Sequence, residues 1–241
     1  MANDANLQRA MVVVAHPDDA EWGCSGTVAL WCRDGVEVVY VICTDGGKGT
    51  DDPDMTSERL AKIRREEQMA ACEVLGVKEV VFLDHEDSML QPTLELRRDI
   101  AREIRRFKPD AVITPYPGRS LSIPGYIGHP DHAAAGEATL AAVFPAARDR
   151  LTFPELLDEG LEPHKVKELF IMADIGENAD KWIDVTRNIV TAIEALKQHR
   201  SQVDDEEAEK MMRSWREAMG KPKNVRYAEA YKHFRLDEWE T

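Results

Sequence analysis

Four short apolar runs separated by longer amphipathic stretches most strongly limit how this chain of 241 residues can fold. The runs are rich in β-branched residues and do not alternate between apolar and polar positions, which is typical of strands buried on both faces of a parallel sheet. They cover residues 11–15, 36–44, 79–83 and 110–114, with helical patterns at 25–33, 57–75 and 93–107 between them. This order predicts an α/β fold with a Rossmann-like, doubly wound, mainly parallel sheet flanked by helices.

The second half of the chain continues this pattern. We expect a helix from residue 130 to about 143, a strand at 168–172, and helices at 186–200, 205–219 and 225–234. Ser57 is the expected N-cap of the helix at 57–75, and Gly76 its C-terminal stop. Since no repeat or linker divides the sequence, residues 1–241 are predicted to form a single domain.

The composition excludes several classes of protein. Asp and Glu outnumber Lys and Arg by 45 to 31, and a chain with a net charge of −14 is not expected to bind nucleic acid. No apolar stretch is long enough to span a membrane, and the first residues lack the pattern of a signal peptide. The four cysteines are scattered without a metal-binding or disulfide spacing. These features predict a cytoplasmic protein with reduced thiols.

Two clusters of histidine and aspartate follow predicted strands. The first, His-Pro-Asp-Asp, begins at His16 after the first strand, and the second, His-Pro-Asp-His, begins at His129 after the fourth. Either cluster alone is explained as an ordinary turn or, for the second, as the capped start of a helix. In an open parallel sheet, however, ligands bind at the carboxyl ends of the strands where the strand order reverses. If the first and fourth strands flank that point, the two clusters form one site.

Imidazole and carboxylate groups together favour a divalent metal such as zinc. A catalytic zinc site needs three protein ligands and an open position, so the two clusters hold more polar groups than ligation requires. A carboxylate beside a ligand can act as a general base, and a neighbouring histidine can stabilise an oxyanion or protonate a leaving amine. Iron, cobalt or nickel could replace zinc in a site of this kind.

With these two clusters, the sequence closely resembles the LmbE-like (PIG-L) family of zinc-dependent de-N-acetylases. The resemblance covers most of the chain and is strongest in AHPDDAEWGCSGTVA, from residue 15, and GHPDHAAAG, from residue 128. It continues through IRREEQMAACEVLG at 63–76 and ALKQHRSQ at 195–202. It implies an LmbE-like fold, a zinc cofactor and hydrolysis of the N-acetyl group of a small N-acetylglucosamine-type sugar or conjugate. Relatives are often homo-oligomers, hexamers among them.

The resemblance also implies roles for residues of the two motifs. Carried over by motif position, the zinc ligands are His16, Asp19 and His132. Asp18 is then the general base that activates the attacking water.

Further roles follow from the same resemblance. His129 polarises or protonates the tetrahedral intermediate and is oriented by Asp131. Arg64, Tyr126 and Asp84 are expected to contact substrate, although a surface ion pair within its own helix explains Arg64 equally well.

Two other functions stay open. The same site could serve an amidase that removes a different acyl group or cleaves a thiol-conjugate amide, or the chain could be a non-catalytic metal- or sugar-binding module. Specificity is expected in the loops 45–54, 116–128 and 148–165, the last of which is predicted to be irregular. Glu21 is expected to support the ligands, and His199 to be structural or at a subunit contact.

Overall fold

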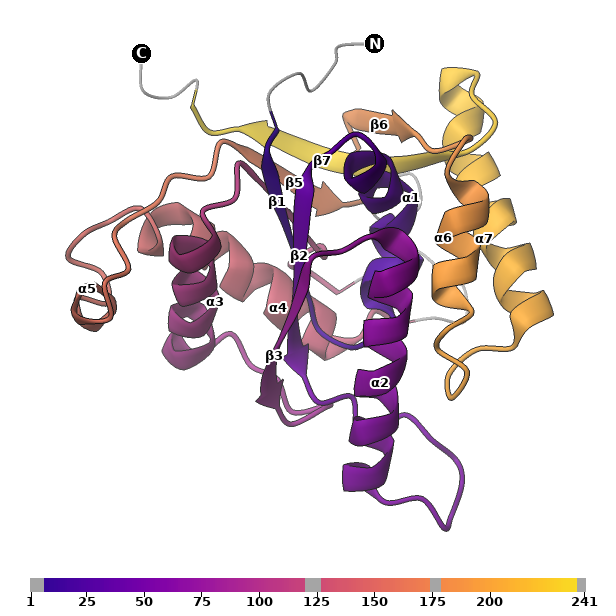
Figure 1. Cartoon of the computed structure of the whole chain (residues 1–241), viewed down its shortest axis with the longest axis horizontal. Coiled ribbons are helices and arrows are strands. Elements are labelled where there is room, and N and C mark those ends of the chain that lie inside the picture. Colours follow the sequence, from indigo (N-terminus) through magenta and orange to yellow (C-terminus); the bar gives the residue numbers. More distant parts are fainter. Residues whose placement is uncertain (1–6, 120–126, 174–178, 238–241) are drawn as a thin grey trace.

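The computed structural model describes residues 7–119, 127–173 and 179–237, and in these residues the strands form one mixed sheet with helices on both faces (Figure 1). The strands are β1 (Arg9–Val14), β2 (Glu37–Thr44), β3 (Glu79–His85), β4 (Ala111–Thr114), β5 (Glu168–Met172), β6 (Lys181–Asp184) and β7 (Ala228–Arg235). Their order in the sheet is β3-β2-β1-β4-β5-β7-β6. Neighbours from β3 to β5 are parallel, whereas β7 is antiparallel to both β5 and β6. The predicted mainly parallel α/β architecture is confirmed.

Two layers of helices cover this sheet. One face carries α1 (Asp19–Arg33), α2 (Ser57–Leu75), α6 (Ile189–Leu196) and α7 (Asp205–Gly220), and the other carries α3 (Leu94–Phe107) and α4 (Pro130–Ala141). The shorter segments are α5 (Glu155–Asp158), the π-helix η1 (Ala142–Ala146) and the 3-10 helix η2 (Lys221–Lys223). None of the described helices is long and apolar enough to cross a membrane.

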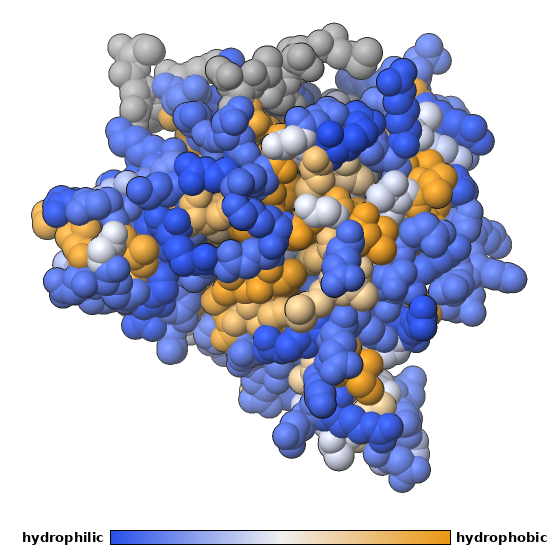
Figure 2. Space-filling view, in the orientation of Figure 1, coloured by the Kyte–Doolittle hydropathy of each residue, from blue (hydrophilic) through white to orange (hydrophobic). Residues whose placement is uncertain are grey.

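The central strand β1 explains the unbroken apolar runs of the sequence. Val12 and Val14 pack into the core beneath α1 and α6, whereas Met11 and Val13 pack beneath α3 and α4, and all four side chains are fully buried. Because both faces are covered, no polar position alternates with the apolar ones. At the edge of the sheet the covering is thinner: residues 80–83 of β3 are half-buried, and apolar side chains gather over this strand in Figure 2.

The strand order reverses between β1 and β4, which is the condition under which the sequence predicts that the two clusters meet. β1 pairs with β2 on one side and with β4 on the other, both in parallel, so the carboxyl ends of β1 and β4 open at the same edge of the sheet. The segments that leave these two ends carry the two His/Asp clusters, which therefore meet.

The structure corrects the prediction at several elements. The helix predicted at 225–234 is wrong: these residues form most of β7, whose pairing with two neighbours outweighs the helix propensity of its Ala, Glu and Lys residues. The four-residue strand β6 was missed. The helix predicted from residue 25 begins at Asp19. The N-cap of α2 is Thr56, not Ser57, because the side chain of Thr56 accepts the N–H of Arg59 at 3.2 Å. The loop 148–165, predicted to be irregular, contains the short α5.

A buried ion pair is inserted into the middle of α1. The backbone N–H of Gly26 donates to Glu229 at 2.9 Å, and the carbonyl of Trp22 accepts from Arg216 at 2.6 Å. In a regular helix these two backbone groups pair with each other. Arg216 of α7 and Glu229 of β7 also pair with each other at 3.0 Å. Both elements are therefore bound to the backbone of α1 about one turn after the first cluster.

Candidate metal centre

The first cluster lies in the tight turn between β1 and α1. Asp19 folds back so that its Oδ2 accepts the backbone N–H of His16 at 2.8 Å, and His16 Nδ1 lies 3.4 Å from the same oxygen. Asp18, between them, has a φ of 95°, an unfavourable left-handed conformation for a residue with a side chain. The turn thus holds His16 and Asp19 together and directs Asp18 separately.

The second cluster lies at the start of α4. His129 is the N-cap of this helix and Pro130 its first residue, so His132 lies in the first turn of the helix. Nε2 of His132 is 3.0 Å from Oδ1 of Asp19. The ring centroids of His16 and His132 are 5.2 Å apart, and those of His16 and His129 are 4.7 Å apart. The structure therefore brings both predicted clusters into one site.

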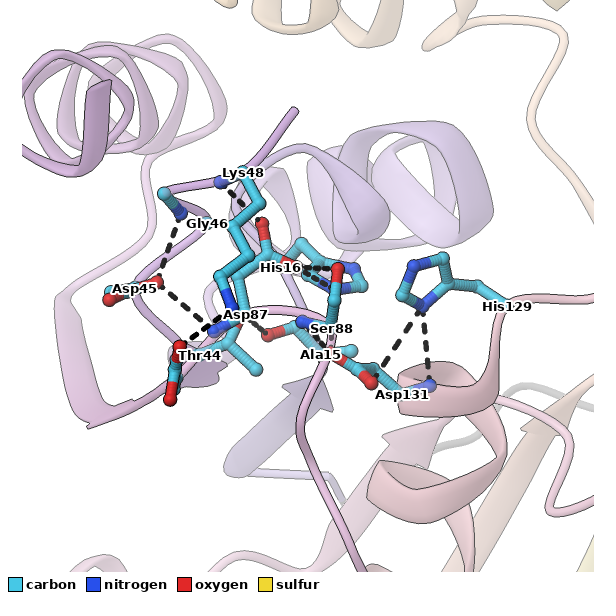
Figure 3. Close-up of polar contacts among 12 residues, drawn as sticks. Ala15, His16, Thr44, Asp45, Gly46, Lys48, Asp87, Ser88, His129 and Asp131 are labelled. Atoms are coloured by element: carbon cyan, nitrogen blue, oxygen red, sulfur yellow. Dashed lines mark hydrogen bonds and ion pairs between the residues drawn. The ribbon is translucent and has the colours of Figure 1, made fainter. Parts of the chain in front are cut away.

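Two buried carboxylates face His16 from other elements (Figure 3). Oδ2 of Asp131 and Oδ1 of Asp87 each lie 3.2 Å from His16 Nε2. Asp131 also accepts the N–H of Ser88 at 2.7 Å, and Asp87 accepts the N–H of Lys48 at 3.0 Å, so backbone donors fix both groups. The carboxylate of Asp131 thus faces His16 with Oδ2, and its Oδ1 lies 4.0 Å from Nδ1 of His129, the ring that the resemblance implies it orients.

Sequence reasoning missed Asp87. It follows β3, whose carboxyl end opens at the same edge as those of β1 and β4, so the rule that selected the two clusters also selects this segment. The resemblance points instead to Asp84 of this segment. The structure pairs the half-exposed side chain of Asp84 with Arg65, and turns the chain at Asp84 with a φ of 56° so that Asp87 reaches the site.

The donor set fits a divalent cation. Burial opposes protonation of His16, yet Asp19, Asp131 and Asp87 raise its pKa to about 12, so these carboxylates strongly favour a positive charge at this point. Oδ1 of Asp131 is buried and has no hydrogen-bond partner among the described residues. Nitrogen and oxygen donors in this mixture suit zinc and related metals.

Two sets of three residues each have donor atoms close enough together to bind one metal ion. One joins His16, His129 and His132, and the other joins His16, Asp87 and Asp131; within each group all donor atoms are within 4.8 Å of one another. His16 belongs to both groups, which marks its imidazole as the centre of the cluster.

Asp18 lies beside these groups and has a different partner. Burial raises the pKa of its carboxyl to about 6, and the guanidinium of Arg64, 3.4 Å from Oδ1, opposes this rise. Arg64 is only 4% exposed and donates to the carbonyls of Pro17 and Gly46 at 2.5 and 3.0 Å. The surface ion pair considered for Arg64 is therefore wrong, and Arg64 fixes the turn that carries Asp18.

The imidazole of His129 is oriented by backbone. Its Nδ1 accepts the N–H of Asp131 at 3.2 Å, so the proton of the neutral ring is on Nε2. Burial and the charge of His16 lower the pKa of His129, which keeps the ring neutral. About a third of the side chain is exposed, so the Nε2–H is available as a donor. Tyr126, the remaining predicted substrate contact, lies outside the described residues.

Known proteins resemble this chain over nearly all its length. It is 32% identical to a diacetylchitobiose deacetylase of Thermococcus kodakarensis over 93% of this chain and 82% of that protein. It is 28% identical to a probable N-acetyl-alpha-D-glucosaminyl L-malate deacetylase 2 of Bacillus subtilis over 82% of this chain and 84% of that protein.

The fold is shared with solved structures. The N,N'-diacetylchitobiose deacetylase of Pyrococcus horikoshii, solved with an inhibitor, superposes with a TM-score of 0.85 at 30% identity, over 95% of this chain and 85% of that one. The sequence profile of the PIG-L family, described as GlcNAc-PI de-N-acetylase, matches residues 11–143, which is more than half of the chain and includes both clusters. The chain belongs to the PIG-L family.

Proposed function

We propose that the protein is a zinc-dependent de-N-acetylase that hydrolyses the N-acetyl group of an N-acetylglucosamine-type sugar or conjugate. One observation carries this proposal: Asp19 joins His16 of the first cluster to His132 of the second, and the carboxylate of Asp18 stands next to them with another partner. A purely structural metal site has no use for this additional, separately held carboxylate. Deacetylation is the activity named for the two curated relatives and the Pyrococcus structure described above.

We propose His16, Asp19 and His132 as the ligands of the ion. When bound, Zn²⁺ supplies Lewis-acid chemistry: it polarises the amide carbonyl and lowers the pKa of water. Asp87 and Asp131 hold His16 from behind through Nε2, which fixes the ring and leaves Nδ1, on the side of Asp19, as the nitrogen for ligation.

We assign the proton transfers to Asp18 and the stabilisation of the oxyanion to His129. Asp18 takes a proton from the attacking water and later delivers it to the leaving amine, so that acetate and a free amino sugar result. Arg64 favours the ionised form of Asp18, which is the form that a base requires. The Nε2–H of His129 donates to the oxyanion that develops on the acetyl carbonyl.

The substrate class is tested with a panel of amides. Purified protein loaded with Zn²⁺ is given N-acetylglucosamine, N,N'-diacetylchitobiose and N-butyrylglucosamine, and released acid and free amine are quantified with and without a chelator. We expect chelator-sensitive acetate release from at least one acetylated sugar. Faster release of butyrate would indicate an amidase for a different acyl group. Sugar binding by calorimetry without any hydrolysis would indicate a binding module.

The proposal also includes the localisation, the assembly and the type of partner of the enzyme. We propose a cytoplasmic enzyme that assembles as a homo-oligomer, as members of the family often do, and that acts on small molecules. The net charge of −14 supports a substrate other than nucleic acid. Analytical ultracentrifugation measures the assembly directly.

A further inference from the structure

A series of hydrogen bonds between buried side chains leads from the backbone of Asp18 to Gln68, Glu21 and His199. The backbone N–H of Asp18 donates to Oε1 of Gln68 at 3.0 Å. Nε2 of Gln68 donates in turn to Oε2 of Glu21 at 3.1 Å. The side chain of Gln68 is fully buried. It links the turn at Asp18 to Glu21 of α1, three positions later in the sequence. An amide is well suited to this place because one end accepts and the other donates.

The series ends at His199. Its Nε2 lies 3.1 Å from the same Oε2 of Glu21, and both side chains are fully buried. One carboxylate oxygen therefore serves both Gln68 and His199, while Oε1 of Glu21 has no hydrogen-bond partner among the described residues. Glu21 and His199 fix the direction of the Gln68 amide, since a rotated amide would face Glu21 with oxygen and the Asp18 N–H with nitrogen.

Asp18 needs such support. Its φ of 95° is unfavourable for a residue with a Cβ, and such a conformation persists only where the surroundings over-determine it. Although Asp18 occupies the N-cap position of α1, its side chain makes no capping hydrogen bond, so the carboxylate is free for another task. The conformation is held instead through the N–H by Gln68 and through the side chain by Arg64.

We infer that Gln68, Glu21 and His199 are positioning residues that hold the backbone of Asp18 and thereby aim its carboxylate. Among the described residues, the side-chain hydrogen bonds of Gln68, Glu21 and His199 lead to Asp18 and to one another and not to His16, Asp19 or His132. This inference rests on the proposed function, because it assigns to Gln68 a share in turnover. A misplacement of a reacting group by about 1 Å can cost about 10²-fold in rate, which sets the size of effect expected.

The substitutions Gln68→Met, Glu21→Met and Glu21→Gln test this arrangement, with Gln8→Met as matched control. Gln8 is exposed and directly precedes β1, so it lies at the amino ends of the parallel strands, away from the site at their carboxyl ends. For each variant kcat, KM, bound zinc and melting temperature are measured. We expect Gln68→Met to lower kcat by about 10²-fold, with KM changed less than about threefold and zinc content unchanged. Glu21→Gln keeps an oxygen for both donors and should retain most of the wild-type kcat, unlike Glu21→Met.

The double variant separates positioning from mere stability. If Glu21 acts on turnover only through Gln68, Gln68→Met/Glu21→Met has the kcat of Gln68→Met alone, although its melting temperature falls further. Multiplicative losses in kcat, or a Gln68→Met enzyme with wild-type kcat, would overturn the inference.

A measurement without turnover keeps the two proposals distinguishable. In the wild-type protein the Asp18 amide should show slowed hydrogen exchange by NMR, because it lies before α1 and its acceptor is the side chain of Gln68. If the wild-type protein hydrolyses none of the amides, the proposed function fails while a protected Asp18 amide still supports the hydrogen-bonded series. Fast hydrogen exchange at the Asp18 amide of the wild-type protein would refute the hydrogen-bonded series from Asp18 to His199. This result does not depend on whether Gln68→Met folds.

Discussion

His132 Nε2 lies 3.0 Å from Oδ1 of Asp19, while Oδ2 of the same carboxylate accepts the backbone N–H of His16. Asp19 thus links the two motifs, although Asp19 and His132 are 113 positions apart in the sequence. Burial alone raises the pKa of Asp19, but His132 and His16 hold it well below its usual value. The two motifs depend on each other through this one carboxylate.

Replacement of His132 should therefore remove the metal and leave the fold in place. We expect His132→Ala to weaken zinc binding by at least about 100-fold, since even partners of ligands contribute 10- to 100-fold. Elemental analysis after dialysis against a weak chelator measures this. His164→Ala is the control, because His164 contacts the carbonyl of Pro109 just before β4, at the opposite edge of the sheet. Full zinc occupancy in His132→Ala would show that His132 is not a ligand.

The ion pair inserted into α1 should contribute strongly to stability. Glu229→Gln leaves the buried guanidinium of Arg216 without its carboxylate, which costs about 3–5 kcal/mol in free energy of unfolding. Glu209→Gln is the control, since the half-exposed carboxylate of Glu209 in the same helix α7 pairs with Arg213 and Lys197 near the surface, where each pair contributes below about 1 kcal/mol. Urea denaturation compares the two. Equal losses would mean that the insertion into α1 contributes nothing.

The pair of His199 and Glu21 predicts a dependence of stability on pH. Burial lowers the pKa of His199, but the hydrogen bond and charge of Glu21 outweigh it and raise the pKa above the unfolded value of about 6.5. The folded state then binds the proton more tightly, so the stabilisation is fully present below about pH 6.5 and is lost as pH rises through the folded pKa. The stability lost in His199→Gln should be larger at pH 6 than at pH 9, as measured by urea denaturation.

His164 supplies a control of opposite sign for this experiment. Burial lowers the pKa of His164 despite a hydrogen bond to the carbonyl of Pro109. The folded state therefore disfavours the protonated form, and the wild-type protein should gain stability over His164→Gln as pH rises through about 6.5. If both variants show the same trend with pH, the assignment of His199 as the protonated partner of Glu21 is wrong.

The features that the sequence predicted are those that local pattern encodes. Unbroken apolar runs such as that of β1 require burial on two faces, and two His/Asp clusters after strands require a common edge. The strand β7 was missed because its residues favour a helix by themselves and become a strand only by pairing with β5 and β6. The antiparallel half of the sheet thus depends on tertiary context.

The parts of the site that the sequence did not reveal are contacts between distant segments. Glu21 and His199 are 178 positions apart, and no periodicity links them. Arg64 fits a surface pattern on α2, yet it is buried because the turn with Pro17 offers a backbone carbonyl to its guanidinium. The sequence does not distinguish Asp87 from Asp84, since only the turn after β3 decides which carboxylate reaches His16.

The central claim is that Asp18 performs chemistry at a site whose ion is held by other residues. It is tested most directly by measuring bound zinc and acetate release from N,N'-diacetylchitobiose, or from the best substrate of the panel, on the same sample of Asp18→Asn. We predict zinc content equal to that of the wild-type protein and a rate of acetate release lower by about 10²- to 10⁴-fold, the usual contribution of a general base. Acetate release at the wild-type rate by Asp18→Asn, with zinc bound, would contradict the account.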